Sequence, residues 1–267
     1  MNDGQLPPVP LDAVAGHSSE LGVTLFMGAM AALTLVFALV HWRRTGRPIF
    51  LLLFCVGGLM VFFEPMVDTV GAVWFPANSM VALELYHRII PIWVCLTYFS
   101  YFGIGVGAAW LAIRAQPTRR RLWTLWCAFI VADVVMEVVL LHLDGIYLYY
   151  AAPPLVVAKF PLWWAPVNSL IIVGTAAVIR RLEPTLRGPR YLLIIPAGLS
   201  CSAAGNAVAG WPSWLVINSD LGPLPTQLGG VATFAAAAWI VGGVLAPLVG
   251  PGGATAVPST EPTTVAV

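Results

Sequence analysis

Two carboxylates, Asp133 and Glu137, stand four residues apart within the largely apolar stretch Ala132–Tyr150. This spacing places both side chains on one face of a helix, about one turn apart. A carboxylate buried in lipid is costly, so it must face a partner or a water-filled cavity. Two acids in different surroundings can hold different protonation states, which general acid–base catalysis requires. We therefore expect Glu137 and Asp133 to form the central acid–base pair of a polar cavity.

The composition indicates the kind of protein that must build this cavity. The chain has 267 residues, of which 59% are hydrophobic and only 9% are charged. Soluble domains carry roughly 25% charged residues, and several apolar runs here are long enough to cross a bilayer. We expect an all-α, polytopic integral membrane protein in a bacterial plasma membrane. Membrane lipids are expected partners, whereas a formal net charge of +1 gives no reason to expect nucleic acid.

The apolar runs predict a seven-transmembrane-helix bundle over residues 21–249. An extracytoplasmic N-terminal arm, residues 1–20, is expected before it, and a disordered cytoplasmic tail, residues 250–267, after it. The spans are expected at residues 21–40, 50–70, 89–113, 122–141, 161–179, 191–209 and 228–249. Glu64-Pro65 interrupts the second span near its end.

The basic residues set the expected orientation through the positive-inside rule. Of the 13 Lys and Arg residues, only Arg88 and Lys159 fall on one side of the seven-span arrangement. The remaining ones fall on the other side: Arg43, Arg44, Arg47, Arg114, Arg119, Arg120, Arg121, Arg180, Arg181, Arg187 and Arg190. The N-terminus is therefore expected outside and the C-terminus in the cytoplasm.

A layer of polar residues is expected in the outer half of the bundle. Helix rise places Glu64, Glu137 and Asn206 at about 24 Å from the cytoplasmic end of their spans, with Asn168 at a similar level. Glu64 and Asp68 are second candidates for acid–base work. The residues expected to bind and orient a substrate are Tyr147, Asn168, Asn206, His87 and Arg88.

Other interpretations of this layer stay open. The buried acids can pair with polar neighbours and lock helix packing. A non-catalytic lipid-binding or transport protein can use the same layer. A metal site at Glu64, Asp68, His87 and His142 fits by residue type, but no HxxxH or HExxH spacing supports it. A retinal protein is disfavoured because the only lysine, Lys159, falls in a loop.

One segment resembles a known family. The run Asp133–Glu137 is followed by Gly145-Ile146-Tyr147-Leu148-Tyr149, by Phe160-Pro161 at the start of the next span, and by Arg180-Arg181 at its end. This pattern, with Glu64-Pro65 upstream, is similar to the AveC-like integral membrane proteins, which include the actinobacterial spirocyclase of avermectin biosynthesis. The resemblance covers residues 50–185.

The resemblance implies a membrane-embedded spiroketal cyclase or dehydratase of secondary metabolism, acting on a lipophilic polyketide or isoprenoid-like small molecule. Ketal closure needs an acid that protonates a carbonyl or a departing hydroxyl and a base that accepts the proton of the attacking hydroxyl. No cofactor is expected, because the reaction needs none and the sequence contains no cofactor motif. Glu137 and Asp133 are the residues expected to do this acid–base work.

Overall fold

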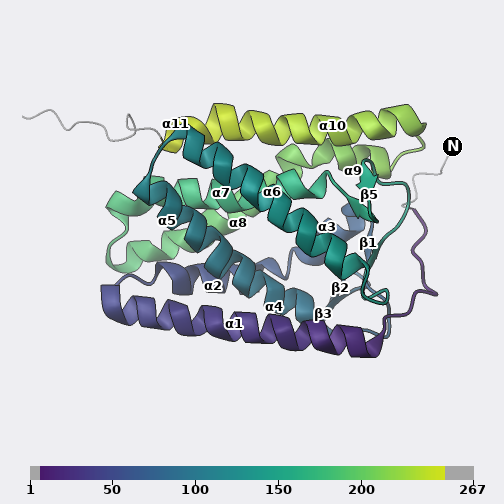
Figure 1. Ribbon diagram of the computed structural model, residues 1–267, viewed down its shortest axis with the longest axis horizontal. Helices are drawn as coiled ribbons and strands as arrows, with labels where there is room; N and C mark the ends of the chain where they lie inside the picture. Colours follow the sequence, from purple (N-terminus) through teal and green to yellow (C-terminus); the bar gives the residue numbers. More distant parts are fainter. Residues whose placement is uncertain (1–6, 250–267) are drawn as a thin grey trace, which may run out of the picture.

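A computed structural model describes residues 7–249 of the chain, and these residues form a bundle of helices aligned along one axis (Figure 1). The tail predicted at 250–267 and the start of the predicted arm lie outside this range. Within it, six helical stretches are long and apolar enough to cross a membrane, and a bent pair, Ile49–Met60 with Glu64–Gly71, passes the same test as a unit. The protein is therefore a polytopic helical membrane protein.

The elements follow one another along the chain with few long loops. The first half contains α1 (His17–Thr45), α2 (Ile49–Met60), α3 (Glu64–Gly71), β1 (Val73–Trp74), β2 (Val81–Leu85), β3 (Arg88–Pro91), α4 (Ile92–Ser100), the π-helix η1 (Tyr101–Val106) and α5 (Gly107–Ala115). The middle contains α6 (Arg119–Leu141), β4 (Leu148–Tyr149), β5 (Val156–Val157), β6 (Phe160–Pro161) and α7 (Trp164–Leu182). The last third contains the 3₁₀ turns η2 (Glu183–Thr185) and η3 (Gly188–Leu193), then α8 (Ile194–Ala204), the π-helix η4 (Gly205–Ala209), α9 (Trp211–Ile217), α10 (Pro223–Trp239), the π-helix η5 (Ile240–Leu245) and α11 (Ala246–Val249).

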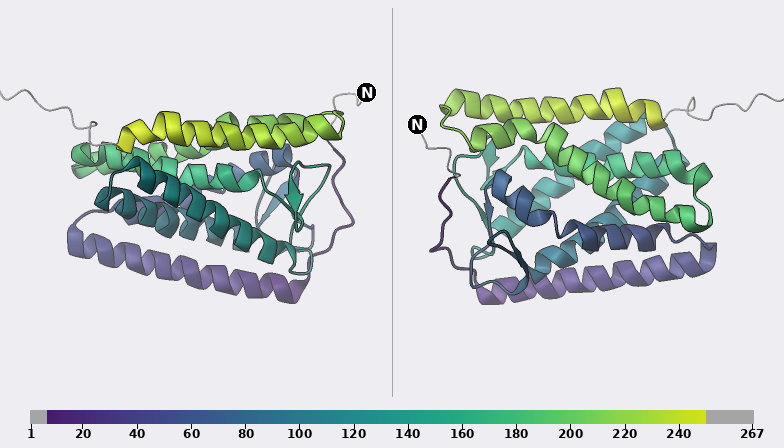
Figure 2. Two further views of the ribbon diagram at one scale, coloured as in Figure 1. Left: turned by 45° about the horizontal axis from the view of Figure 1, so that its top comes forward. Right: turned by 180° about the vertical axis from the view of Figure 1, so that it is seen from behind.

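Helix α7 is the centre of the bundle. In an 18-residue apolar segment of α7, 72% of the residues are buried. In the corresponding segments of the stretches that contain α1, α6 and α10, only 22–28% are buried. Small side chains such as Ala165, Ala176 and Ala177, all fully buried, let neighbouring helices approach its backbone. The two views of Figure 2 show α1 and α10 on opposite sides of the molecule, with the other helices between them. Their exposed apolar faces, including Phe26 and Leu228, suit a lipid environment.

Several helices are interrupted, and the interruptions matter for the site. Helices α2 and α3 meet at a bend of 54° across residues 61–63. Pro65 occupies the first turn of α3, where its missing N–H costs no helical hydrogen bond. The π-helical segments η1 and η5 each insert a wider turn into a long helix, and η4 forms the last turn of the stretch that begins with α8. Such bulges are frequent at functional sites.

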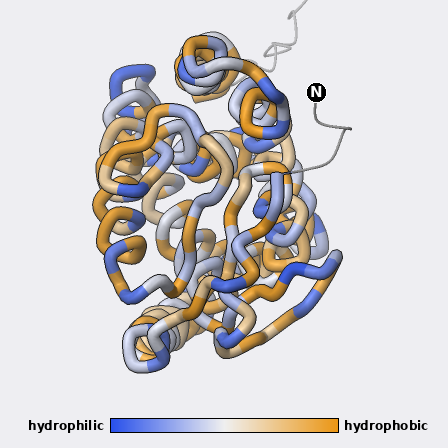
Figure 3. The backbone as a smooth tube through the Cα atoms, turned by 90° about the vertical axis from the view of Figure 1, so that its right-hand side faces the viewer, coloured by the Kyte–Doolittle hydropathy of each residue, from blue (hydrophilic) through white to orange (hydrophobic). Residues whose placement is uncertain are grey.

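Short antiparallel strand pairs close one end of the bundle. In the part of the chain that the structure describes, β1 pairs with β4, β2 with β3, and β5 with β6. Figure 3 views this end, where hydrophilic and hydrophobic residues alternate along the connecting segments. The arginine-rich ends of α1, α5 and α7 lie at the opposite end (Figure 1). We call the two ends the strand end and the arginine end.

Two features correct the predicted bounds of the spans and loops. The third long helix begins at Ile92 rather than at residue 89, because Arg88–Pro91 form an extended strand paired with Val81–Leu85. Pro91 lacks an N–H and disfavours the helical conformation in the residue before it, which explains this boundary. The segment expected to be a loop at residues 210–227 contains α9 and the start of α10.

Candidate functional site

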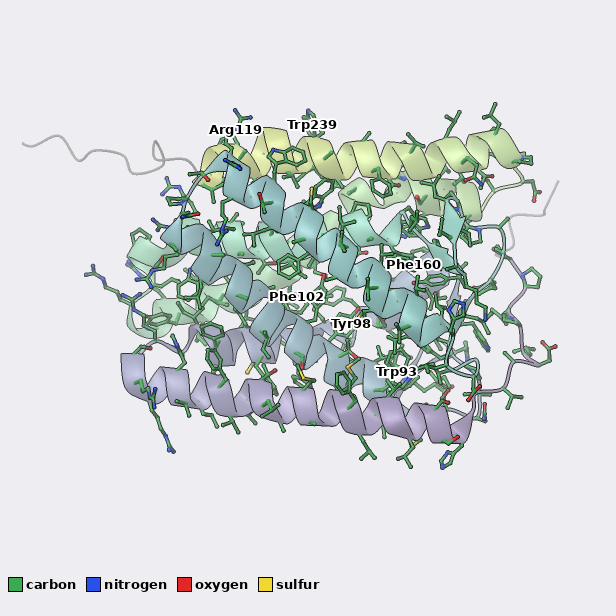
Figure 4. The ribbon with its side chains drawn as sticks, viewed as in Figure 1. Trp93, Tyr98, Phe102, Arg119, Phe160 and Trp239 are labelled. Carbon is green, nitrogen blue, oxygen red and sulfur yellow. The ribbon has the colours of Figure 1, made fainter. Side chains whose placement is uncertain are left out.

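A cavity of about 130 Å³ lies within the bundle, toward the strand end. Its lining combines residues of α3, α4, η1, α6, α7, α8, η4 and the β1–β4 pair. Figure 4 shows Trp93, Tyr98 and Phe102, three of its lining residues, in succession from the strand end toward the middle. The polar lining comprises Glu64, Asp68, Thr97, Tyr98, Tyr101, Asp133, Glu137, Tyr147, Tyr149, Asn168, Ser202 and Asn206. All four acids predicted for chemistry therefore share one cavity.

Helix α6 contributes the first carboxylate pair. It is a 23-residue helix, and the four-residue spacing of Asp133 and Glu137 turns both side chains toward α7 and the cavity. Asp133 is buried, and both of its carboxylate oxygens accept from Asn168 Nδ2 at 3.3 Å. Asn168 is held in turn by Tyr101, whose hydroxyl donates to the Asn168 carbonyl. Asp133 thus faces amide donors.

Glu137 lies in different surroundings, against two tyrosines from the strand end. The Tyr147 hydroxyl donates to Glu137 Oε2, and the Tyr149 hydroxyl donates to the same oxygen at 3.4 Å. The β1–β4 pairing fixes these tyrosines, since Val73 pairs with Tyr149 and Trp74 with Leu148. Burial, and then the nearby charge of Glu137, raise the pKa of both phenols well above the usual range. Both hydroxyls therefore remain donors toward Glu137.

Helix α3 contributes the second pair, Glu64 and Asp68, again four residues apart. The bend between α2 and α3 puts Glu64 at the first position of α3, where the helix dipole favours a negative charge. The Tyr98 hydroxyl donates to Glu64 Oε2. Asp68 is buried, and its Oδ2 has no hydrogen-bond partner within residues 7–249. A polar ligand group in the cavity can satisfy this oxygen.

Two π-helical segments bring further side chains into the lining. Tyr101 opens η1 and Asn206 lies in η4. Gly205 allows η4 to approach α7 closely, because a Cβ at this position would lie 2.7 Å from Ile171 Cγ1. Asn206 Nδ2 donates to the Ser202 carbonyl at 3.1 Å, while its buried Oδ1 has no partner among the described residues. The amide oxygen is therefore available to a donor in the cavity.

The structure separates His87 and Arg88 from the other predicted substrate-binding residues. His87 is exposed at the turn between β2 and β3 and does not line the cavity. Arg88 is buried beside the cavity wall rather than in it. Its guanidinium donates to the Tyr150 hydroxyl at 2.6 Å and to the Val73 carbonyl at 3.3 Å, and it lies 5.0 Å from the Trp74 ring centroid. Arg88 thus fixes the strand end behind the site.

Sequence reasoning missed several lining residues. Tyr98 and Tyr101 lie in the third predicted span, and their hydroxyls donate to Glu64 and to the backbone of α7. The available signal was their three-residue spacing, which places both tyrosines on one face of a helix. Trp93 and Trp164 also line the cavity, and their buried indole N–H groups have no acceptor within the described part of the chain.

The arrangement is suited to proton transfer and to binding of an oxygenated, largely apolar molecule. Carboxyl groups and phenols surround the same space, with apolar residues such as Val94, Phe102 and Ile171 between them. Within residues 7–249, no group of three or more His, Cys, Asp or Glu side chains converges as metal ligands do. The lining residues themselves supply carboxyl groups, phenols and amides as acids, bases and hydrogen-bond donors.

Comparison of the chain with protein-family models, with curated proteins and with solved structures gives no match.

Proposed function

We propose that this protein is a membrane-embedded cyclase that closes a ketal ring on a lipophilic polyketide or isoprenoid-like substrate by carboxylate acid–base catalysis. One observation carries the proposal: two pairs of carboxylates, from α3 and α6, line a single cavity inside the helical bundle. The resemblance to AveC-like spirocyclases over residues 50–185 supports the same chemistry. No cofactor takes part in the proposed reaction.

The reaction converts a ketone bearing two hydroxyl groups into a spiroketal and water. One protonated carboxyl group donates to the ketone oxygen while a carboxylate accepts the proton of the first attacking hydroxyl, which gives a hemiketal. The hemiketal hydroxyl is then protonated and leaves as water, and the second hydroxyl attacks the same carbon and gives its proton to a carboxylate. In this scheme Glu137 and Asp133 give protons to the substrate and accept protons from it. Their hydrogen-bond partners differ, phenols for Glu137 and an amide for Asp133, so the two acids can hold different protonation states.

The size of the cavity suits the reacting part of such a substrate. A protein cavity of about 150 Å³ can hold benzene, and the cavity here measures about 130 Å³. One six-membered ring in formation fits, whereas the remainder of a long chain must extend between helices toward the lipid. Confinement by Phe102 and Ile171 would hold the hydroxyl near the carbonyl, which favours ring closure.

The proposal includes seven spans, with the N-terminus outside, when α2 and α3 count as one broken span. Broken helices are tolerated at membrane depth where they line a cavity, as α3 does with Glu64 and Asp68. The arginine end would face the cytoplasm. The site would then be approached from the non-cytoplasmic half of the bilayer.

This topology predicts the labelling of single cysteines in intact cells. In a variant whose four native cysteines are replaced by alanine, Ser219→Cys should react with a membrane-impermeant maleimide. Gln116→Cys should react only after the cells are permeabilised. Both positions are exposed, Ser219 between α9 and α10 and Gln116 between α5 and α6. The reverse pattern would overturn the orientation.

Asn206→Leu is expected to separate stability from activity. Leucine has a similar size. It loses the hydrogen bond from Nδ2 to the Ser202 carbonyl but also removes an amide oxygen that is buried without a partner in the described structure, and the second effect offsets the first. The free energy of unfolding should therefore stay the same or rise by up to about 1 kcal/mol, while ring closure slows at least about tenfold. Thermal unfolding and turnover of the same preparation measure both quantities. Full activity with unchanged stability would remove Asn206 from the site.

The function itself is tested with an achiral keto-diol, a ketone with a hydroxyl four carbons away on each side. The full-length protein in lipid nanodiscs should consume this probe faster than empty nanodiscs do. A protein that binds the probe without accelerating its closure is instead a lipid-binding or transport protein that uses the same polar layer. If the protein neither binds the probe nor accelerates its closure, both functions are contradicted for this substrate class.

A further inference from the structure

A second cavity, of about 550 Å³, lies at the arginine end. It is separate from the carboxylate cavity, and the two have no lining residue in common within residues 7–249. Its walls come from the α1–α2 connection, the ends of α5 and α7, and the turns η2 and η3. The lining residues are Arg47, Ile49, Arg114, Arg180, Glu183, Pro184, Leu186, Arg187 and Tyr191.

Three arginines converge on one glutamate in this cavity. Glu183 Oε1 lies 3.2 Å from Arg47 Nη1 and 2.8 Å from Arg114 Nε, and Glu183 Oε2 lies 3.5 Å from Arg180 Nη1. Only 13% of the Glu183 side chain is exposed, whereas 34–44% of each arginine side chain remains accessible. Glu183 therefore holds three guanidinium groups around one space without covering them.

The charge of the cavity is not balanced by its described lining residues. Four arginines, the three above and Arg187, face a single carboxylate, which leaves an excess of three positive charges. Each guanidinium has five N–H donors, and the ion pairs with Glu183 use few of them. Arg180 Nε is also buried without an acceptor among residues 7–249. The cavity thus presents several converging donors and a local positive potential.

We propose that this cavity binds a phosphate group. Phosphate oxygens match the planar fork of arginine, and such pairs are among the strong hydrogen bonds. A phosphate carries up to two negative charges, which would offset most of the excess. The apolar wall of Ile49 and Leu186 suits a group attached to the phosphate. The ligand is either the headgroup of an anionic phospholipid, as in other basic pockets between transmembrane helices, or a free phosphate compound.

The test measures thermal unfolding of the full-length protein in two series. In the lipid series, nanodiscs of phosphatidylcholine contain increasing fractions of phosphatidylglycerol. In the second series, pure phosphatidylcholine nanodiscs receive inorganic phosphate, with sodium chloride at equal ionic strength as reference. A saturable rise of the melting temperature in either series supports the site, because a ligand that binds only the folded state stabilises it. The series that gives the rise identifies the source.

Arg187→Gln provides the decisive variant, since Arg187 lines the cavity but makes none of the ion pairs with Glu183 found in the described residues. It should raise the ligand concentration at half-saturation at least about fivefold. Arg190→Gln is the matched control, because Arg190 is an exposed arginine of the neighbouring turn outside the lining. Equal effects of the two variants, or no stabilisation by either phosphate source, would overturn the proposal. Both outcomes are independent of ring closure.

Discussion

Replacing Glu137 by glutamine is expected to lower the rate of ring closure by about 10²- to 10⁴-fold, the usual contribution of a general acid or base. Glutamine keeps the size of the side chain and still accepts from the tyrosine hydroxyls through its amide oxygen. It cannot accept or release the proton of a reacting hydroxyl. The variant should therefore remain folded and still bind the keto-diol.

The control for this variant is Glu84→Gln, which removes an exposed carboxylate on β2 at the same end of the molecule. It should leave turnover unchanged. Turnover of keto-diol by Glu137→Gln at the wild-type rate would contradict the acid–base assignment. If Glu137→Gln instead fails to fold, the carboxylate mainly holds the helices together, as the structural interpretation of the polar layer requires.

Arg88→Ala is expected to lower the free energy of unfolding by roughly 3 kcal/mol, the largest effect on stability foreseen for a single residue. Hydrogen bonds that involve a charged group contribute about 1.5–3 kcal/mol each, and Arg88 makes two of them from a buried position. They join β3 to Val73 in β1 and to Tyr150 beyond β4. The stacking of the guanidinium on Trp74 is lost as well.

Two comparisons isolate this effect in thermal or denaturant unfolding. Lys159→Ala removes an exposed cation at the same end, whose hydrogen bond to the Leu141 carbonyl is long, at 3.5 Å, so stability should change by less than about 0.5 kcal/mol. Arg88→Lys keeps the charge but not the planar fork of the guanidinium. Its loss of unfolding free energy should therefore lie between those of Lys159→Ala and Arg88→Ala. If Arg88→Ala were as stable as the wild type, the strand end would not depend on this residue.

The sequence was sufficient to predict the long helices because bilayer thickness sets their length and composition. The expected span at 122–141 corresponds to α6, and the span at 161–179 to α7. The β1–β4 pair escaped prediction because it joins Val73 to Tyr149, which lie far apart in the chain. The other two pairs, β2–β3 and β5–β6, are short local hairpins. The bend at residues 61–63 was signalled by Glu64-Pro65, whereas nothing in the sequence indicated that η1 and η4 are π-helical.

Some residues of the candidate site could also be predicted from the sequence, and others could not. Charge within an apolar run was a strong signal, so Glu64, Asp68, Asp133 and Glu137 were all found, and the structure brings them to one cavity. Tyrosines are common near membrane surfaces, so their type alone did not single out those of α4 and η1. Nothing in the sequence indicated that His87, at the turn between β2 and β3, is exposed and lies outside the cavity lining.

The stereochemistry of the product tests the central claim most directly. Uncatalysed closure of an achiral keto-diol gives the two mirror-image spiroketals in equal amounts, whereas closure inside an asymmetric cavity favours one of them. The wild-type protein in nanodiscs should give a clear enantiomeric excess, and Glu137→Gln should give none. A racemic product from the wild-type protein, formed at the rate of empty nanodiscs, would contradict the proposal that this cavity is a cyclase active site.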